Sequence, residues 1–243
     1  MLTFLNTPIA VAYHIVFALS QFLAPVTGGL ATAAAIIVFT LAVRLLLSPL
    51  SFTALRGQAR IAALQPKIAE LRSRYSRQPD RLQRELTALY AAEGGGMLAG
   101  CLPLLLQLPF FSVIYRLLES ATVAGRTNAL LASRLLAAPL GSHWLIGAGP
   151  ASAQGLVFLG LFALIGAACF AATRAARNGP PAPAAGKVIT SAMPYLTVVL
   201  AAFAPLAAGL YLLTSTAWTA AERAIWRRRI RLDGQRPAAV TPG

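Results

Sequence analysis

Three stretches of this sequence stay apolar for about the length that a helix needs to cross a bilayer. They cover residues 29–49, 98–118 and 154–173. A spanning α-helix takes roughly 20 mostly apolar residues to cover about 30 Å of hydrocarbon. The chain is also 57% hydrophobic and 12% charged, with a mean hydropathy of +0.67, which is unusual for a soluble domain. The pattern predicts an all-α, polytopic membrane protein.

Two more spans are predicted near the carboxyl end. Residues 188–225 form an apolar region nearly twice the length of one span, and Pro205 interrupts it. Because proline cannot continue the hydrogen bonding of a helix, we expect two spans in a tight hairpin, over residues 193–203 and 207–226. The predicted core, residues 27–222, therefore has five transmembrane helices.

The amino-terminal region, residues 1–26, contains a shorter apolar segment. Residues 8–25 are interrupted by His14, Ser20 and Gln21, so we interpret them as an interfacial helix on the outer side of the membrane. If this segment crossed instead, the core would have six spans and the amino terminus would change sides. The first residues lack a basic region, so a removable signal peptide is not expected.

The basic residues determine the expected orientation. Lys and Arg are most numerous in the loop after the first span, in the loop after the third span, and in the tail of residues 223–243. By the positive-inside rule these segments are cytoplasmic. Five spans then place the amino terminus outside, in agreement with a first stretch of 43 residues that contains no Lys or Arg. We expect a multi-pass protein of the bacterial plasma membrane.

The loop between the first two spans, residues 51–94, carries a helical pattern of its own. Apolar residues recur at steps of three and four in two stripes. Pro66 predicts a kink or a fresh helix start, and Pro79 followed by Asp80 predicts a second helix with Asp80 as its cap. The pattern indicates a cytoplasmic helical hairpin, although a plain solvated connector remains an alternative. The candidate functional residues of the hairpin are Ile61, Leu64, Lys67, Ile68, Leu71, Arg72, Leu82 and Leu86.

Arg44 lies inside the first apolar run. Thr40, Arg44 and Ser48 are four residues apart, so they share one helical face. Burying an arginine near a helix centre costs roughly 2.5 to 3.5 kcal/mol, so such a residue normally faces a bundle interior or a wet cavity. The alternative is that Arg44, being near the cytoplasmic end, extends its long side chain to the membrane surface.

Other polar residues inside the predicted spans favour a wet groove lined by several helices. Each of them alone is more often a packing residue, and Trp218 could belong to an aromatic belt at the interface. The candidate lining residues, beside those of the first span, are Gln107 in the second span and Tyr211, Thr214, Ser215 and Trp218 in the last, where Glu222 shares their face.

In these stretches the sequence resembles the YidC family of membrane protein insertases. Four motifs carry the resemblance in matching order: VRLLLSPL from Val43, LQPKIAELRSRY from Leu64, DRLQRELTALYAAEGGGMLAGCLPLLLQLPFF from Asp80, and FAPLAAGLYLLTSTAW from Phe203. The resemblance covers residues 31–222, which is most of the chain.

The resemblance implies a five-span core with a groove that is open to the cytoplasm and to lipid, closed on the outer side, and holds one positive charge. Position by position, Arg44 matches the groove arginine, Gln107 the glutamine of the second span, and Trp218 a polar-faced residue of the last span. The hairpin matches the cytoplasmic hairpin thought to receive incoming substrates. Without the large periplasmic domain of Gram-negative members, the chain is similar to the short Gram-positive type. Thr216 and Glu222 depart from the asparagine and glutamine that are common at their positions.

The expected function is a membrane protein insertase and chaperone that uses no nucleotide, because no phosphate-binding loop or catalytic constellation is visible. A substrate helix with a short acidic tail would slide along the groove, attracted by Arg44, and then move sideways into lipid. We expect no enzyme activity and no cofactor. Cys101 and Cys169 both lie in apolar segments, so neither a disulfide nor a metal site is expected.

Two other classes of protein are alternatives to an insertase. A small-anion transporter or channel would use Arg44 to bind an anionic solute, although the internal repeats common in transporters are not visible. A membrane-embedded enzyme fits poorly, because His14 and His143 have no ligand cluster near them in the sequence.

The formal charge of +14 points to anionic partners. The tail RRRIRLDGQR could anchor the chain to anionic lipid or contact ribosomal RNA. The expected partners are nascent membrane proteins and the lipid bilayer, with the Sec translocon and the ribosome as further candidates and no small-molecule substrate.

Overall fold

The computed structural model describes residues 6–92, 112–113, 115–118, 120, 122–123, 126–145, 151–177 and 195–234. At residues 6, 54–55, 58–62, 126, 175–177 and 226–234 it describes the backbone alone. The described chain is mostly helical, as predicted for an all-α protein. The predicted span over residues 98–118 falls mostly outside the described residues, and so do Gln107 and Cys101.

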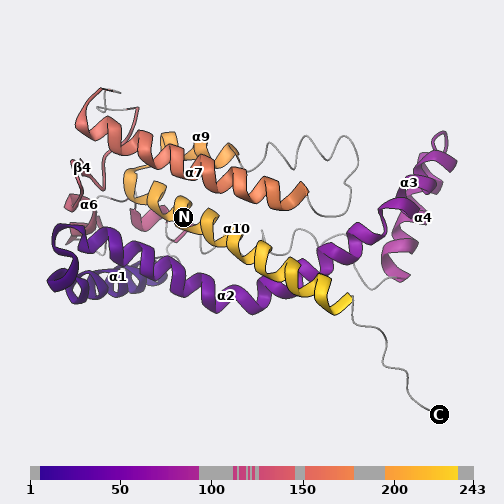
Figure 1. Cartoon of the computed structure of the whole chain (residues 1–243), viewed down its shortest axis with the longest axis horizontal. Helices are drawn as coiled ribbons and strands as arrows, with labels where there is room; N and C mark the ends of the chain where they lie inside the picture. Colours follow the sequence, from indigo (N-terminus) through magenta and orange to yellow (C-terminus); the bar gives the residue numbers. More distant parts are fainter. Residues whose placement is uncertain are drawn as a thin grey trace, which may run out of the picture.

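Three long helices lie side by side along the long axis of the molecule: α2 (Ala31–Ala63), α7 (Ala153–Arg177) and α10 (Leu206–Gly234) (Figure 1). Helix α10 packs against both α7 and α2. A shorter helix, α9 (Leu196–Phe203), packs on α7 and α10. The core between these helices is mostly apolar, and Phe158, Ile165 and Leu206 are completely buried in it.

Helix α10 approaches α7 closely because of a glycine. A Cβ atom placed on Gly209 would lie 2.6 Å from Cδ2 of Leu161, which is itself buried on α7. A side chain at this point of α10 would require Leu161 to shift. Glycine at position 209 therefore permits a close contact between α10 and Leu161 that a larger residue would disturb.

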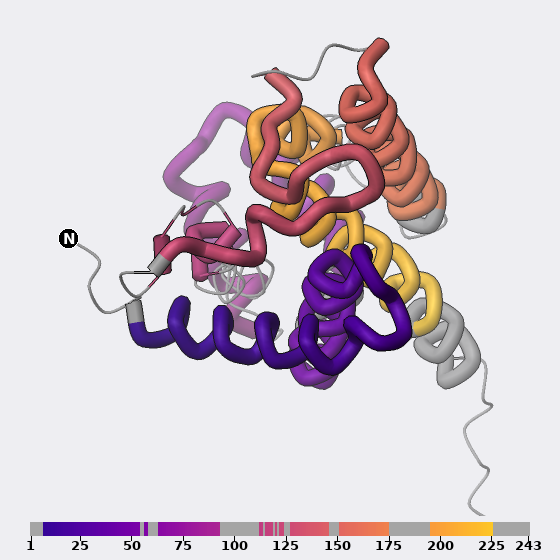
Figure 2. Tube along the Cα trace, turned by 90° about the vertical axis from the view of Figure 1, so that its left-hand side faces the viewer, coloured from indigo at the N-terminus to yellow at the C-terminus, as the bar shows by residue number. Residues whose placement is uncertain are grey.

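Helix α1 (Asn6–Thr27) runs crosswise to α2 at one end of the bundle, and the short 3-10 turn η2 (Gly28–Leu30) joins them (Figures 1 and 2). Val16 is buried against the rest of the protein, whereas Phe22 and Val26 are 78% and 86% exposed. The sequence prediction of a helix over residues 8–25 is confirmed. The helix is mostly apolar on both its packed and its exposed side, and the polar residues His14 and Gln21 are exposed.

Pro205 separates α9 from α10, as predicted. Ala204 has an extended backbone (φ −86°, ψ 154°) and its N–H closes the last turn of α9 by donating to the carbonyl of Leu200. Residues before a proline avoid the helical region, so the chain leaves one helix at Ala204 and begins the next at Leu206.

Helix α2 is longer than the sequence prediction. The first span was expected to end at residue 49 and the hairpin to begin at residue 51, but α2 continues through Pro49 to Ala63 as one helix of 33 residues. A proline removes one backbone donor and can kink a helix without ending it. The residues after Pro49 contain no second proline before Pro66.

The helical hairpin predicted from the sequence is formed by α3 (Gln65–Arg74) and α4 (Pro79–Ala92). Pro66 lies in the first turn of α3, which confirms the predicted helix start. The prediction of Asp80 as a cap is wrong: α4 already begins at Pro79, and Asp80 lies in its first turn. Proline suits the first helical position because the N–H it lacks has no partner there anyway.

Short β-structure connects the helices at the end of the bundle that lies far from the hairpin. Strands β1 (Thr122–Val123) and β2 (Arg126–Thr127) pair antiparallel, as do β3 (Arg134–Leu135) and β4 (Ala138–Pro139), with the short helix α6 (Ala129–Ala132) between the pairs. The sequence did not predict these strands, because segments of two residues are too short for a periodic pattern.

We call residues 126–145 the cap segment because it closes the start of α10. The N–H groups of Leu206 and Ala207 donate to the carbonyls of Ser142 and Leu140, both at 2.9 Å. His143 forms a β-bridge with Pro205. The first N–H groups of a helix have no partner within it, so the cap segment satisfies two that would otherwise be buried and unpaired.

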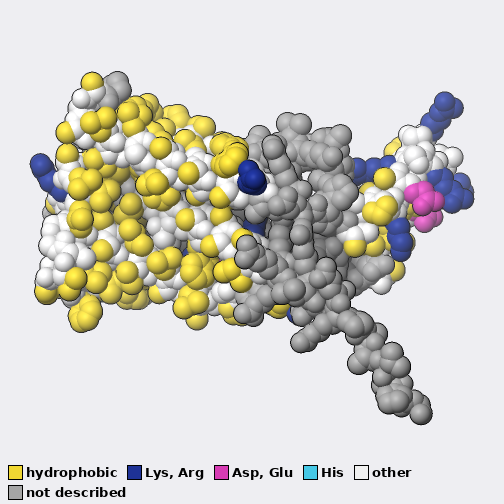
Figure 3. All heavy atoms as spheres, in the orientation of Figure 1, with side chains coloured by type: hydrophobic (Ala, Val, Ile, Leu, Met, Phe, Trp, Pro, Cys, Tyr) yellow, Lys and Arg dark blue, Asp and Glu magenta, His cyan; other side chains and the backbone are white. Residues whose placement is uncertain are grey.

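Two helical stretches among the described residues are long and apolar enough to cross a membrane, residues 7–53 and 153–174. Figure 3 shows mostly hydrophobic side chains over the end of the molecule that contains α1, α7 and the start of α2, while Lys, Arg, Asp and Glu gather on the α3–α4 hairpin. The described chain is consistent with an all-α membrane protein that carries a charged hairpin on one side.

Candidate functional site

Arg44 is the charged residue of α2 that lies among the helices. Its side chain is half-buried, and its Nη2 donates a hydrogen bond to Oγ of Ser215 on α10. The two residues are 171 positions apart in the sequence, and the packing of α2 on α10 brings them together. The guanidinium is thus held by a neighbouring helix instead of extending along α2 to its end.

The other two polar residues of this α2 face are Thr40 and Ser48. Thr40 is 3% exposed, and its hydroxyl donates to the carbonyl of Ile36 at 2.7 Å. Ser48, one turn beyond Arg44, is half-buried. The Thr40 hydroxyl is thus satisfied within α2. Arg44 is the residue of this face for which a hydrogen bond to α10 is described.

The facing side of α10 is lined by buried polar residues. Tyr211 and Ser215 are each 6% exposed and Thr214 is 9% exposed, and the Thr214 hydroxyl donates to the carbonyl of Leu210 at 2.9 Å. Of the residues predicted on the first and last spans, Arg44 and Ser215 are therefore in direct contact.

Two polar atoms on this face of α10 lack a hydrogen-bond partner. Among the described residues, the buried Nε1 of Trp218 and the buried Oε1 of Glu222 are both unpaired. Glu222 is 8% exposed. A buried polar group that has no partner at all costs about 1 to 3 kcal/mol.

The charges near the contact are of both signs. Arg44 interacts electrostatically with Tyr211 and with Glu222, and Glu222 interacts with Arg223 as well. The sequence had placed Glu222 on the same face as the candidate residues without including it among them. Its spacing of four residues from Trp218 was the signal that could have identified it.

The predicted hairpin residues divide into a packed set and an exposed set. Leu64 and Ile68 are buried, at 6% and 2% exposed. Lys67 and Arg72 are exposed, the side chain of Ile61 is not among the described ones, and three further apolar residues are half-buried: Leu71, Leu82 and Leu86. The apolar stripe thus holds the hairpin together, and the basic residues remain on its surface.

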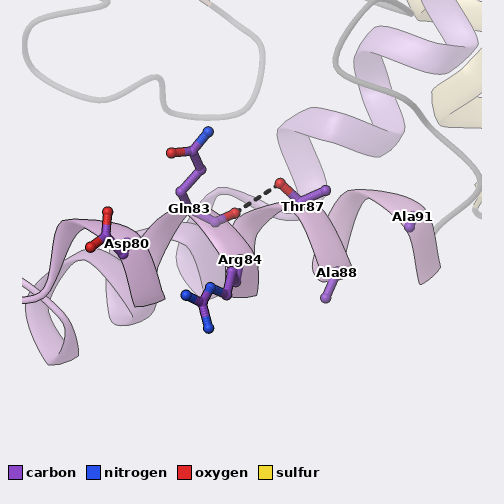
Figure 4. A pocket seen from close by; sticks show the side chains of 6 residues that line it. All are labelled: Asp80, Gln83, Arg84, Thr87, Ala88 and Ala91. Atoms are coloured by element: carbon purple, nitrogen blue, oxygen red, sulfur yellow. Dashed lines mark hydrogen bonds between the residues drawn. The ribbon is translucent and has the colours of Figure 1, made fainter.

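A hollow on the surface of α4 is lined by six residues, shown in Figure 4: Asp80, Gln83, Arg84, Thr87, Ala88 and Ala91. The hydroxyl of Thr87 donates to the backbone carbonyl of Gln83 at 2.8 Å, so it is satisfied within the helix. Asp80 and Arg84 are one turn apart with opposite charge. The hollow lies on the exposed side of the hairpin, away from Arg44.

No candidate metal site occurs in the part of the chain that the structure describes, where no three His, Cys, Asp or Glu side chains come together. His14 makes an edge contact with the ring of Tyr13, and His143 takes part in the cap segment. That the protein has no metal, no cofactor and no enzyme activity stays a prediction.

The chain was compared with known proteins. Residues 22–233 match the family model described as 60Kd inner membrane protein. Membrane protein insertase YidC of Acidiphilium cryptum (strain JF-5) is 42% identical over 115 residues, which are 47% of this chain and 18% of that protein. Proteins of the same name are 42% identical in Helicobacter pylori (strain ATCC 700392 / 26695) and 39% identical in Campylobacter jejuni (strain ATCC 700819 / NCTC 11168), each over 87 residues.

Those 87 residues are 36% of this chain and 16% of each of the two relatives, so the chain matches less than a fifth of the length of all three proteins. The family match is broader, because it extends from α1 to the end of α10 and contains α2, the hairpin, the cap segment and α7. The chain therefore belongs to the 60Kd inner membrane protein family, as a YidC-family protein.

Proposed function

We propose that this protein is a membrane protein insertase, and that the polar contact between α2 and α10 belongs to a groove through which the tail of a client passes. The observation that carries the proposal is the position of Arg44, a guanidinium held against Ser215 inside a mostly apolar bundle. The names of the relatives, membrane protein insertase YidC, support the same function.

The chemistry of the contact fits a client with an acidic tail. A carboxylate crossing a membrane loses its hydration, and a nearby cation and hydroxyl groups reduce that loss. Arg44 supplies the cation. The proposed groove is lined further by Thr40 and Ser48 of α2, by Tyr211, Thr214, Ser215 and Trp218 of α10, and by Gln107 of the second span. Once the tail has crossed, the apolar helix of the client moves into lipid and gains about 25 cal/mol per Å² of apolar surface removed from water. No nucleotide is needed for either step.

The proposed arrangement in the membrane has five spans, with the amino terminus outside and the carboxyl tail in the cytoplasm. Helix α1 would lie in the outer interface, because it runs crosswise to α2 (Figure 2) and because its side chains Phe22 and Val26 are exposed. The cap segment would close the groove on the outer side, and the charged hairpin would face the cytoplasm, where clients arrive. The Sec translocon, the ribosome and anionic lipid are proposed partners of the cytoplasmic side.

Replacing Arg44 tests the proposal. In vesicles that contain this protein as the insertase, Arg44→Gln should lower the insertion of a single-span client with an acidic tail roughly tenfold, which corresponds to about 1.4 kcal/mol. Arg44→Lys should keep part of the activity, because the groove needs charge more than paired hydrogen bonds. Insertion is measured as the fraction of client tail that becomes protected from protease.

Arg56→Gln is the matched control, because it removes one positive charge from the same helix at an exposed position. A client with an uncharged tail is the second control and should respond little to Arg44→Gln. Equal insertion of the acidic client by wild type and Arg44→Gln would contradict the electrostatic step. Saturable uptake of a small anion by the same vesicles, with no insertion, would instead favour a transporter.

A further inference from the structure

We propose that Glu222 determines which clients the groove accepts: its fixed carboxylate competes with the acidic tail of a client for Arg44 and so weakens the binding of strongly acidic tails. This inference rests on the proposed function and adds to it a specificity-determining residue.

The placement of Glu222 is the first support. Tyr211, Ser215, Trp218 and Glu222 follow one another at steps of four, three and four along one face of α10. Glu222 is seven residues beyond Ser215, about 10 Å along the helix at 1.5 Å per residue. Helix α10 runs from the cap segment toward the end of the molecule that carries the hairpin (Figure 1), so Glu222 is nearer to that end than Ser215 is.

The burial of Glu222 is the second support. The side chain is 8% exposed, and its Oε1 has no hydrogen-bond partner among the residues that the structure describes. A carboxylate in this state destabilises the protein unless nearby cations compensate it. A residue that costs stability at a binding site is a candidate for a functional role.

The charges around Glu222 are the third support. Arg44 on α2 and Arg223 on α10 both interact with its carboxylate, and Tyr211 on α10 interacts with Arg44. Two positive charges and one negative charge leave a net charge of +1 for the group of Arg44, Arg223 and Glu222. An incoming carboxylate is attracted by the arginines and repelled by Glu222, so the attraction is weaker than two arginines alone would give.

The consequence is a groove that discriminates by the charge of the tail. A single acidic residue still gains from Arg44, while a tail with several acidic residues meets a carboxylate before it reaches the guanidinium.

The test uses vesicles that contain the full chain and a single-span client in two forms, with two aspartates or two asparagines in its tail. Glu222→Gln keeps the size of the side chain and removes its charge. We expect it to raise the initial rate of insertion of the aspartate client roughly threefold to tenfold and to leave the asparagine client unchanged. Glu222→Asp keeps the charge and should keep the wild-type ratio of the two rates.

The matched control is Glu85→Gln, which makes the same change of net charge at an exposed position of α4 and should leave both rates unchanged. The double variant Arg44→Gln with Glu222→Gln should insert the aspartate client no faster than Arg44→Gln, because the competition needs the arginine. Thermal unfolding of each variant is measured beside the rates, and Glu222→Gln should unfold at the same or a higher temperature than wild type.

An unchanged ratio of the two rates in Glu222→Gln, or an equal loss of both, would overturn the inference and leave the proposed function standing. If Arg44→Gln also inserts both clients as wild type does, the electrostatic part of the proposed function fails, and this inference fails with it.

Discussion

Ser215 accepts the hydrogen bond that holds Arg44 between two helices. We predict that Ser215→Ala lowers the free energy of unfolding by about 1.5 to 3 kcal/mol, the range for a hydrogen bond to a charged group. Thermal unfolding in detergent or lipid discs measures the change. The double variant Arg44→Gln with Ser215→Ala should be less destabilised than the sum of the two single variants, because both remove the same bond.

Thr216→Ala is the control for Ser215→Ala, since Thr216 is the next residue of α10 and is half-buried without contacting Arg44 in any described hydrogen bond. It should change the free energy of unfolding by less than about 0.5 kcal/mol. Equal effects of the two substitutions would show that the bond to Arg44 contributes nothing measurable.

At the residue scale the sequence identified polar faces but not the contact between them. The spacing of Thr40, Arg44 and Ser48 gives a face of α2, and the spacing of Tyr211, Ser215 and Trp218 gives a face of α10. Helical periodicity says which side chains share a face and says nothing of which helix lies opposite. The sequence left open whether Arg44 extends to the membrane surface, and the packing of α2 on α10 decides its hydrogen bond.

At the scale of elements, the contact of α7 with α10 depends on Gly209. We predict that Gly209→Ala lowers the free energy of unfolding by about 1 to 3 kcal/mol, the usual cost of overpacking, because the new Cβ would lie 2.6 Å from Cδ2 of the buried Leu161. Gly209→Ala combined with Leu161→Ala should recover the part of this loss that is due to the clash.

Gly166→Ala on α7 is the matched control, because nothing lies within 4 Å of a Cβ at that position. It should be neutral or stabilise the helix by up to about 1 kcal/mol through the higher helix propensity of alanine. A Gly209→Ala protein as stable as Gly166→Ala would mean that Leu161 moves aside without cost.

Helix boundaries were predicted best where the sequence contains a strong signal. Pro205 separates α9 from α10, and Pro66 marks the start of α3, as expected. Pro49 was read as the end of the first span, yet α2 passes through it. A proline removes the same backbone donor in all three places, and whether the helix stops depends on the packing and the residues that follow, which periodicity does not report.

At the scale of the whole molecule, the cap segment closes one end of the bundle, and Asn128 holds the cap segment in place. Asn128 is 2% exposed; its Nδ2 donates to the carbonyls of Leu117 and Ser120 at 2.7 and 3.0 Å, and its Oδ1 accepts from the N–H of Leu130. We predict that Asn128→Ala speeds hydrogen exchange at the N–H groups of Leu206 and Ala207, which donate to the cap segment.

Thr127→Ala, at an exposed neighbouring position, should leave the exchange of these two amides unchanged. Asn128→Asp keeps the acceptor for Leu130 but places a carboxylate oxygen against the carbonyls of Leu117 and Ser120, so it should speed exchange at least as much as Asn128→Ala. Slow exchange at Leu206 in Asn128→Ala would show that the cap segment stays closed without this side chain. The sequence did not predict the cap segment, because its bonds join residues that are far apart in the chain and many of them are made by the backbone.

The unbroken course of α2 links the two ends of the molecule mechanically. Its 33 residues form a rod of about 50 Å that carries Arg44 and leads directly to the start of α3. Pro49 is the place where this rod bends most easily, because the hydrogen bond that its nitrogen would make is absent. A force on α3 and α4 should therefore bend α2 first at Pro49, which is less than two helical turns from Arg44.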